Sequence, residues 1–212
     1  MRYRRCKSPI FFQLNKKFRN VYFFCYLFLI DLNMKLIVWL WNPWAKYEKT
    51  RHNVWFTFIN QWVDFMWFWS WKYESKYKAE MITTEINWEK IVLCKPQTYM
   101  NLSWESVGPI AKFFKIEWKD ILVIHDEIDF VTWRVALKLW WSAAGHNWLK
   151  SIIEKLWTRD FWRVRIGVDR PATKDQIVDW VLSSFKPNEK ELLVEKQDEI
   201  FNFIDEFLTK KK

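Results

Sequence analysis

Short apolar runs alternate with amphipathic segments along most of the chain. Runs rich in aliphatic and β-branched residues predict buried strands at 35–40, 78–86, 90–95, 121–124, 135–139 and 164–168. Apolar positions at helical spacing predict helices within 52–66, 103–114, 149–156 and 188–208. Strands that alternate with helices are typical of α/β proteins. We therefore predict a single α/β domain, with a twisted mixed sheet packed by helices on both sides.

Two of these helices carry further expectations. Ser103 precedes the helix of Val107 and Ile110 and is a plausible N-cap, because its hydroxyl can accept a hydrogen bond from a first-turn N–H. The segment 188–208 predicts one long charged helix, with an apolar face made of Leu192, Leu193, Ile200, Ile204 and Phe207.

Residues 1–33 are basic and aromatic and differ from the rest. They hold seven Lys and Arg residues and one acidic residue, Asp31. The run from Val21 to Ile30 has about the length of the apolar region of a signal peptide, but no small-residue cleavage site follows it. We expect the domain to span 34–212, with Met34 as the native first residue and 1–33 as an upstream extension. A membrane-surface anchor in 1–33 is the alternative.

Composition and charge exclude several classes of protein. Half of the 212 residues are hydrophobic, which excludes wholesale disorder. No apolar run reaches the roughly 18–20 residues of a membrane span. The three cysteines are too few for a disulfide framework and show no zinc-type spacing, which favours a reducing compartment and a cytoplasmic protein. The net charge of +9 comes mostly from residues 1–33, so charge alone does not indicate a nucleic-acid partner.

The chain has 3 glycines and 18 tryptophans, whereas a protein of this length usually has roughly 15 glycines. Several tryptophans occupy positions that favour glycine, because glycine alone tolerates positive φ at little cost. Trp88 follows Asn87 between two strands, Trp157 ends a predicted helix, and a strand-to-loop junction holds Trp39, Trp41 and Trp44. Our hypothesis is that the gene uses UGA as a glycine codon and that UGA was translated as tryptophan.

The alternative is a protein genuinely rich in tryptophan, used for aromatic packing or at a membrane interface. Aromatic packing does not select turn positions, so we favour the codon hypothesis. Trp118 and Trp162 lie where no glycine is required and are compatible with either interpretation.

Five motifs follow one another in the domain. With tryptophan read as glycine, residues 35–44 become KLIVGLGNPG, and Tyr47 and the run 50–53 (TRHN) come next. The later motifs are PQTYMNLS at 96–103, HDEID at 125–129, GHNWLK at 145–150 and RVRIG at 163–167. In this order and spacing, residues 34–208 resemble bacterial-type peptidyl-tRNA hydrolases. Gly108, Gly145 and Gly167 also stand where that family has glycine.

The resemblance implies hydrolysis of the ester between a peptide and the 3′ end of a tRNA, by a monomeric enzyme without a metal or cofactor. Such a reaction needs an activated water and a stabilised oxyanion. His52 follows a loop and opens a helix, and an imidazole ordinarily titrates near neutrality, so we expect it to be the general base. Asp126 follows a buried strand, where α/β sheets place their sites, and we expect it to orient His52.

Amide and groove residues are assigned by the family pattern. Asn42 and Asn101 would hold the 3′-terminal region of the substrate and the attacking water, and Asn147 would position its peptide end. Tyr47 and Met100 would line the groove. Taken alone, these residues have ordinary interpretations: Asn42 a turn, His52 a surface or capping residue, and Asp126 an acid in an ion pair. His125 and His146 are expected to be structural.

Phosphate contacts should dominate the affinity for tRNA. By resemblance, the candidate tRNA-binding residues are Lys138 and Arg165, followed by Arg134 and Lys150. Each of the four has the alternative of being an ordinary solvated charge. A non-catalytic RNA-binding protein on the same scaffold is the rival function, since a fold does not fix a function.

The chain departs from the family pattern in three loops that flank the groove. Residues 130–132 replace a loop that contains proline, and Ala144 and Asp169 each replace a glycine. These departures concern the way in which the substrate is held rather than the chemistry.

Overall fold

The computed structural model describes residues 34–40, 42–66, 70–86, 89–99, 102–132, 134–139 and 160–210. The predicted helix at 149–156 and the junction at 87–88 lie outside these residues. Within them, seven strands form one sheet: β1 (Lys35–Trp39), β2 (Lys72–Glu74), β3 (Ala79–Ile86), β4 (Glu89–Pro96), β5 (Ile121–Glu127), β6 (Val135–Leu139) and β7 (Trp162–Gly167).

The strand order is β2-β3-β4-β1-β5-β7-β6. The central strands β4, β1, β5 and β7 are parallel, whereas β2, β3 and β6 run antiparallel to their neighbours. The sheet is therefore mixed, as predicted. Its parallel centre brings the carboxyl ends of four strands to one edge.

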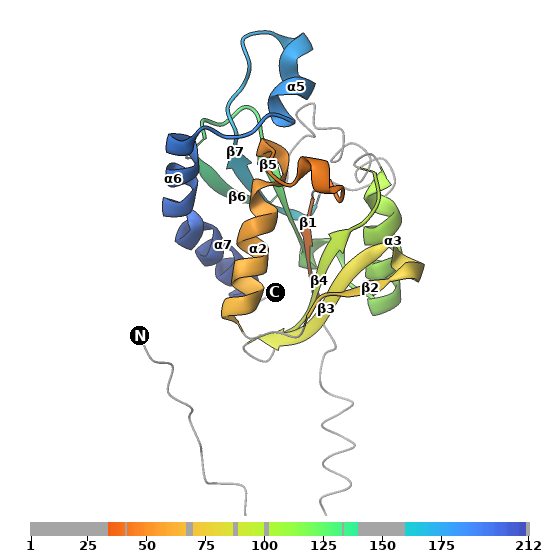
Figure 1. Cartoon of the computed structure of the whole chain (residues 1–212). Helices are drawn as coiled ribbons and strands as arrows, with labels where there is room; N and C mark the ends of the chain where they lie inside the picture. The colour runs from red at the N-terminus through yellow and green to blue at the C-terminus, as the bar shows by residue number, and fades with distance from the viewer. Residues whose placement is uncertain are drawn as a thin grey trace, which may run out of the picture. The chain divides into compact units, whose positions relative to one another are not determined.

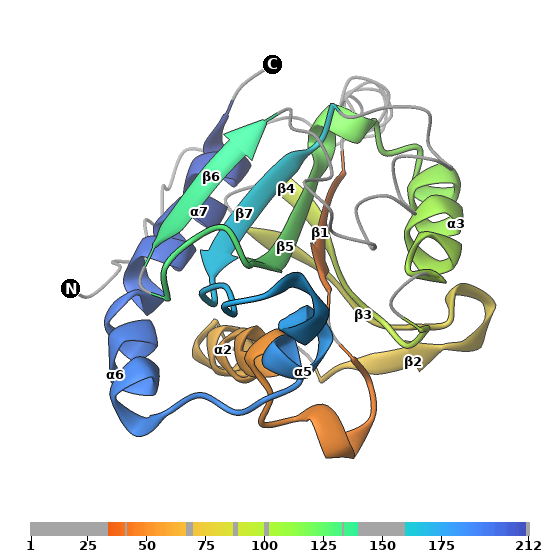
Figure 2. The ribbon, with the colours of Figure 1, turned by 90° about the horizontal axis from the view of Figure 1, so that it is seen from above.

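Helices cover both faces of the sheet (Figures 1 and 2). One face carries α3 (Trp104–Phe114), and the other carries α2 (Val54–Phe65), α6 (Pro187–Glu195) and α7 (Gln197–Thr209). The short helix α5 (Ile177–Val181) lies before α6. The predicted α/β architecture is confirmed.

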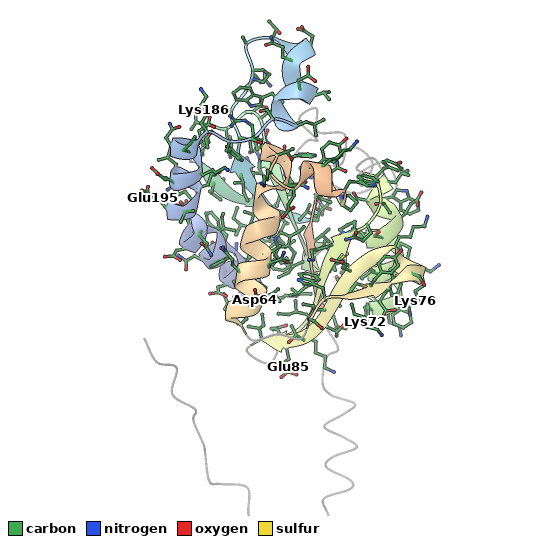
Figure 3. All side chains as sticks on the ribbon, in the orientation of Figure 1. Asp64, Lys72, Lys76, Glu85, Lys186 and Glu195 are labelled. Atoms are coloured by element: carbon green, nitrogen blue, oxygen red, sulfur yellow. The ribbon has the colours of Figure 1, made fainter. Side chains whose placement is uncertain are left out.

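The period of two in the strands explains these layers. In β1, Leu36 and Val38 belong to the apolar cluster that includes Val107 and Ile110 of α3. Ile37 and Trp39 belong to the opposite cluster, with α2 and α7. The charged side chains labelled in Figure 3 project from the surface, among them Asp64, Lys72, Glu85 and Glu195. Both apolar faces are thus buried, and these labelled charges stay in solvent.

Three sequence-based details were wrong. The segment 188–208 forms two helices that meet at Lys196, because this bend lets Leu193 and Ile200 pack in one apolar cluster. Ser103 is at the N-cap of α3 but has helical φ and ψ values of −58° and −25°, so its hydroxyl makes no capping hydrogen bond. Strand β5 extends through Glu127, so Asp126 is part of the strand and does not follow it.

Candidate active site

The neighbouring parallel strands β1 and β5 bring two of the predicted site residues to the same edge of the sheet. Trp39 of β1 is in register with Ile124 of β5, and the N–H of Leu40 donates a hydrogen bond to the Ile124 carbonyl at 3.1 Å. Asn42 and Asp126 each lie two residues further along their own segments. The carboxyl edge of the sheet is where α/β folds place ligands.

His52 lies in the 3-10 turn η2 (Arg51–Asn53), directly before α2. Its Nδ1 is 2.8 Å from Oδ1 of Asp126, and both side chains are almost fully buried. A carboxylate this close to Nδ1 favours the tautomer that carries its proton on Nδ1 and leaves Nε2 as the basic nitrogen. The pair therefore has the geometry of an oriented general base.

Asn42 is held through its backbone by a residue of the same turn. The N–H of Asn42 donates to Oδ1 of Asn53 at 2.8 Å, and the Nδ2 of Asn53 donates to the Asn42 carbonyl at 2.7 Å. Both residues are buried. This reciprocal pairing fixes the loop after β1 against η2, so the backbones of Asn42 and His52 are placed by one amide side chain.

The sequence motifs assigned no role to Asn53, although this residue lies in the run 50–53. The sequence did contain a signal for this role: Asn53 directly follows the proposed base, and an amide side chain can bind a backbone N–H and a backbone carbonyl at the same time.

Tyr47 ends the 3-10 turn η1 (Ala45–Tyr47) and lies beside the Trp44 ring. The ring centroid of Trp44 is 6.5 Å from that of Tyr47 and 4.6 Å from that of Tyr99. Trp44 and Tyr99 are both exposed, so they present aromatic surface to solvent. The predicted site residues Met100, Asn101, Asn147 and Lys150 lie outside the described residues.

The candidate tRNA-binding residues differ in exposure. Arg134 is exposed, and Lys138 of β6 is half-buried. Arg165 of β7 is buried, and its Nε and its terminal nitrogen each lie 2.9 Å from Oε2 of Glu127. The Arg165 guanidinium also lies over the Phe130 ring, at 4.2 Å from the centroid. A phosphate contact by Arg165 would have to compete with this buried ion pair.

Two of the departures from the family pattern contact each other. Asp169 has a φ of 61°, a left-handed conformation that favours glycine and that Asp tolerates better than most residues. Its Oδ2 accepts hydrogen bonds from the N–H of Thr132 at 3.2 Å and from the Thr132 hydroxyl at 2.5 Å. The loop after β5 and the loop after β7 are thus tied together by the two residues that differ from the family.

Fully buried His125 lies next to Asp126 in β5, and its Nδ1 is 2.7 Å from the Asp126 carbonyl oxygen. In β4, burial raises the pKa of the Cys94 thiol and opposes formation of the thiolate. In the described part of the chain, no group of three or more His, Cys, Asp or Glu residues could hold a metal ion.

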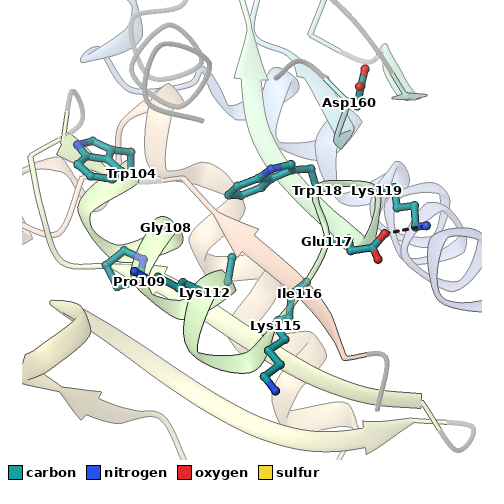
Figure 4. A pocket seen from close by; sticks show the side chains of 11 residues that line it. Trp104, Gly108, Pro109, Lys112, Lys115, Ile116, Glu117, Trp118, Lys119 and Asp160 are labelled. Carbon is teal, nitrogen blue, oxygen red and sulfur yellow. Dashed lines mark ion pairs between the residues drawn. The ribbon is translucent and has the colours of Figure 1, made fainter. Parts of the chain in front are cut away.

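A hollow lies beside α3 (Figure 4). It has a volume of about 1050 Å³, and its lining includes Trp104, Ile116 and Trp118. Among its charged residues, Lys119 is paired with Glu117 at 2.7 Å. None of the predicted site residues lines it, so its size does not mark it as the site of hydrolysis.

The chain is similar in sequence and in fold to known peptidyl-tRNA hydrolases. The family model "Peptidyl-tRNA hydrolase" matches residues 36–212. The peptidyl-tRNA hydrolase of Mycoplasma capricolum is 41% identical over 181 residues, which cover 84% of this chain and 95% of the relative. That of Halalkalibacterium halodurans is 44% identical over 168 residues, which cover 78% and 88%.

A solved structure of peptidyl-tRNA hydrolase from Acinetobacter baumannii matches with a TM-score of 0.74 at 31% identity, covering 84% of this chain and 96% of that chain. A second peptidyl-tRNA hydrolase structure, determined with N-propanol, gives the same TM-score and covers 85% and 97%. On this evidence of sequence and fold, the chain belongs to the peptidyl-tRNA hydrolase family.

Proposed function

We propose that this chain hydrolyses the ester between peptide and tRNA in peptidyl-tRNA, using a water molecule that His52 activates, and so releases tRNA for reuse in translation. Family membership supports the reaction. The observation that carries the mechanism is the buried 2.8 Å contact between His52 and Asp126 at the carboxyl edge of the sheet.

In this mechanism, Asp126 orients the imidazole and stabilises its protonated form. Nε2 of His52 removes a proton from water as the water oxygen bonds to the ester carbonyl carbon. The ester C–O bond then breaks, the peptide leaves as a carboxylic acid, and the tRNA 3′ oxygen takes the proton back from His52. No serine or cysteine nucleophile takes part.

Amide side chains would hold the substrate and the water, since each offers a donor and an acceptor without charge. We assign Asn42 and Asn101 to the 3′-terminal region and the attacking water, and Asn147 to the peptide end. Tyr47 and Met100 would line the groove. The pairing of Asn42 with Asn53 supports this assignment, because it fixes the Asn42 backbone beside His52.

We further propose that Lys138, Arg134 and Lys150 contact tRNA phosphates. Arg165 joins them only if its ion pair with Glu127 opens. The rival function, RNA binding without catalysis, leaves the buried His52–Asp126 pair without a purpose, and we do not favour it.

The test is release of labelled peptide from peptidyl-tRNA by the full chain, beside a His52→Ala variant. We expect the variant to lose about 10²- to 10⁴-fold in kcat, as expected for removal of a general base, while it still binds tRNA. Binding of tRNA by the unmodified chain without any release would favour the rival function instead.

We also propose that most of the 18 tryptophans are glycines in the native protein, encoded by UGA. This proposal is supported by the tryptophans that stand at glycine positions of the family motifs, above all those at positions 39, 41 and 44. In the described residues, the positive-φ positions other than glycine are Lys78, Lys115 and Asp169, so no described tryptophan has that conformation. Positions 88 and 157 lie outside the described residues. The intact mass of the protein from its native host decides the question, and a mass that requires 18 tryptophans refutes the proposal.

Finally, we propose that the enzyme is a cytoplasmic monomer whose native chain starts at Met34. In the described residues, none of the helices is both long and apolar enough to cross a membrane. N-terminal sequencing and the solution mass of the native protein test these points, and membrane association that disappears when 1–33 are removed would favour an anchor in that segment.

A further inference from the structure

Three consecutive side chains of η2 are buried, and each reaches a different part of the fold. Asn53 binds the backbone of Asn42 after β1, and His52 contacts Asp126 of β5. Arg51 turns to the carboxy-terminal segment, where it meets Glu189 of α6. All three residues of this turn are at most 2% exposed.

Arg51 makes more contacts than a single ion pair. Its terminal nitrogen donates to both carboxylate oxygens of Glu189, at 2.8 and 3.0 Å, and its Nε donates to the Ser183 hydroxyl at 3.3 Å. The guanidinium lies 4.1 Å from the ring centroid of Trp180 and 4.6 Å from that of Phe185. The Arg51 N–H also donates to the Ser183 carbonyl at 2.8 Å. Side chain and backbone together fasten η2 to residues 180–189.

Glu189 has a second task. Its Oε2 accepts a hydrogen bond from the N–H of Lys186 at 2.7 Å, and this bond completes the capping box of α6. The Glu189 carboxylate therefore both caps the first turn of α6 and binds the Arg51 guanidinium. The start of this helix and the turn that carries His52 are linked through it.

We propose that Arg51, held by Glu189, is a positioning residue for His52. This rests on the proposed function, in which His52 is the base. His52 follows Arg51 within a turn of three residues, so a shift of the Arg51 anchor rotates the imidazole relative to Asp126. Misplacement of a catalytic group by about 1 Å can cost about 100-fold in rate. Lysine keeps the charge but lacks the flat guanidinium that lies over Trp180 and Phe185 and the separate Nε donor to Ser183.

The test compares Arg51→Lys, Glu189→Gln and the double variant with Glu191→Gln, which changes an exposed carboxylate on the same helix. We expect Arg51→Lys to lower kcat about 10- to 100-fold with KM within about twofold. Glu189→Gln should have a smaller effect in the same direction, and the double variant should lose no more than Arg51→Lys alone. Glu191→Gln should behave as the parent.

An NMR measurement distinguishes a role of Arg51 in positioning His52 from a general effect of Arg51 on stability. The NMR signal of the His52 Nδ1 proton, which reports the contact of Nδ1 with the Asp126 carboxylate, should shift or broaden in Arg51→Lys. A kcat within twofold of the parent, with an unchanged Nδ1 signal, would overturn the proposal even if the melting temperature falls. If Arg51→Lys does not fold, Glu189→Gln decides by the same criteria.

His52→Ala is measured alongside. If it retains activity, the proposed function fails, whereas the Nδ1 signal in Arg51→Lys still decides whether Arg51 positions His52.

Discussion

The carboxyl edge of the sheet and the hollow beside α3 differ in what they bury. At the edge, His52, Asp126 and Asn53 are buried and bonded at 2.7–2.8 Å to partners from other elements. In the hollow, Trp104, Ile116 and Trp118 form an apolar lining, and Lys112 and Lys115 are exposed at the surface.

This difference shows that a sizeable apolar hollow is not by itself evidence of chemistry in this molecule. Groups that are buried and mutually oriented can move a proton, because burial strengthens their electrostatic interaction and fixes their geometry. An open apolar hollow offers surface for contact but no oriented acid or base. Substitutions in the two regions should therefore have very different effects on the rate.

The strongest test of this contrast is Asp126→Asn. An amide cannot stabilise the imidazolium and allows the wrong tautomer of His52, so we expect kcat to fall by about 10²- to 10⁴-fold. Peptide release from peptidyl-tRNA under single-turnover conditions measures it. Asp64→Asn, which changes an exposed carboxylate of α2, is the control. A loss below about tenfold for Asp126→Asn would mean that the pair does not act as an oriented base.

A smaller effect is expected for Asn53→Ala. The substitution removes both hydrogen bonds to the Asn42 backbone, leaving a buried donor and acceptor without this partner. We expect a loss of about 1–3 kcal/mol in the free energy of unfolding and a fall in kcat of about tenfold. Urea unfolding and release kinetics measure the two quantities. The exposed Asn202→Ala should change neither, and an unaffected rate in Asn53→Ala would remove Asn53 from the positioning of Asn42.

The buried side chain of Lys95 should make the free energy of unfolding depend on pH. It is buried between Asn60, Glu80 and the Trp71 ring, and burial lowers its pKa to about 8. The unfolded chain then binds this proton more tightly than the folded chain, so the charged lysine costs stability below pH 8. This cost should disappear as the pH rises from about 8 to 10.5, the ordinary value.

The measurement is the free energy of unfolding of the parent minus that of Lys95→Met. This difference should rise with pH between about 8 and 10.5, by up to about 3 kcal/mol. Lys90→Met, an exposed position on the same strand, should give a flat difference. A flat difference for Lys95→Met as well would show that the ammonium group is not penalised by burial.

The smallest effect is expected in the hollow. Trp118→Leu keeps an apolar lining and touches none of the proposed catalytic residues, so kcat and KM should stay within about twofold of the parent. Release kinetics at several substrate concentrations check this. A large change in KM would give the hollow a part in substrate binding and weaken the contrast drawn above.

The buried strands could be predicted from the sequence, whereas the exposure of a single charged side chain such as Arg165 could not. The continuous apolar runs at 35–40 and 121–124 predicted β1 and most of β5 correctly, since a strand that is buried on both faces is apolar along its length. The resemblance then placed Arg165 on tRNA, but β7 lies between β5 and β6, and this central position buries the side chain against Glu127. The exposure of an arginine depends on the neighbours of its strand, which are not encoded nearby in the sequence.

By itself, the sequence determined the order of strands and helices, the family motifs and the identity of the residues that can do acid–base chemistry. Periodicity and motif spacing are local properties, and a single chain shows them. The sequence also predicted Asp126 as the partner of His52. Only the tertiary structure decided the other partners: Asn53 for Asn42, and Glu189 for Arg51, which lies 138 positions away. Such contacts arise when the strands and helices pack, because burial forces each polar group to find a partner from whichever segment lies beside it.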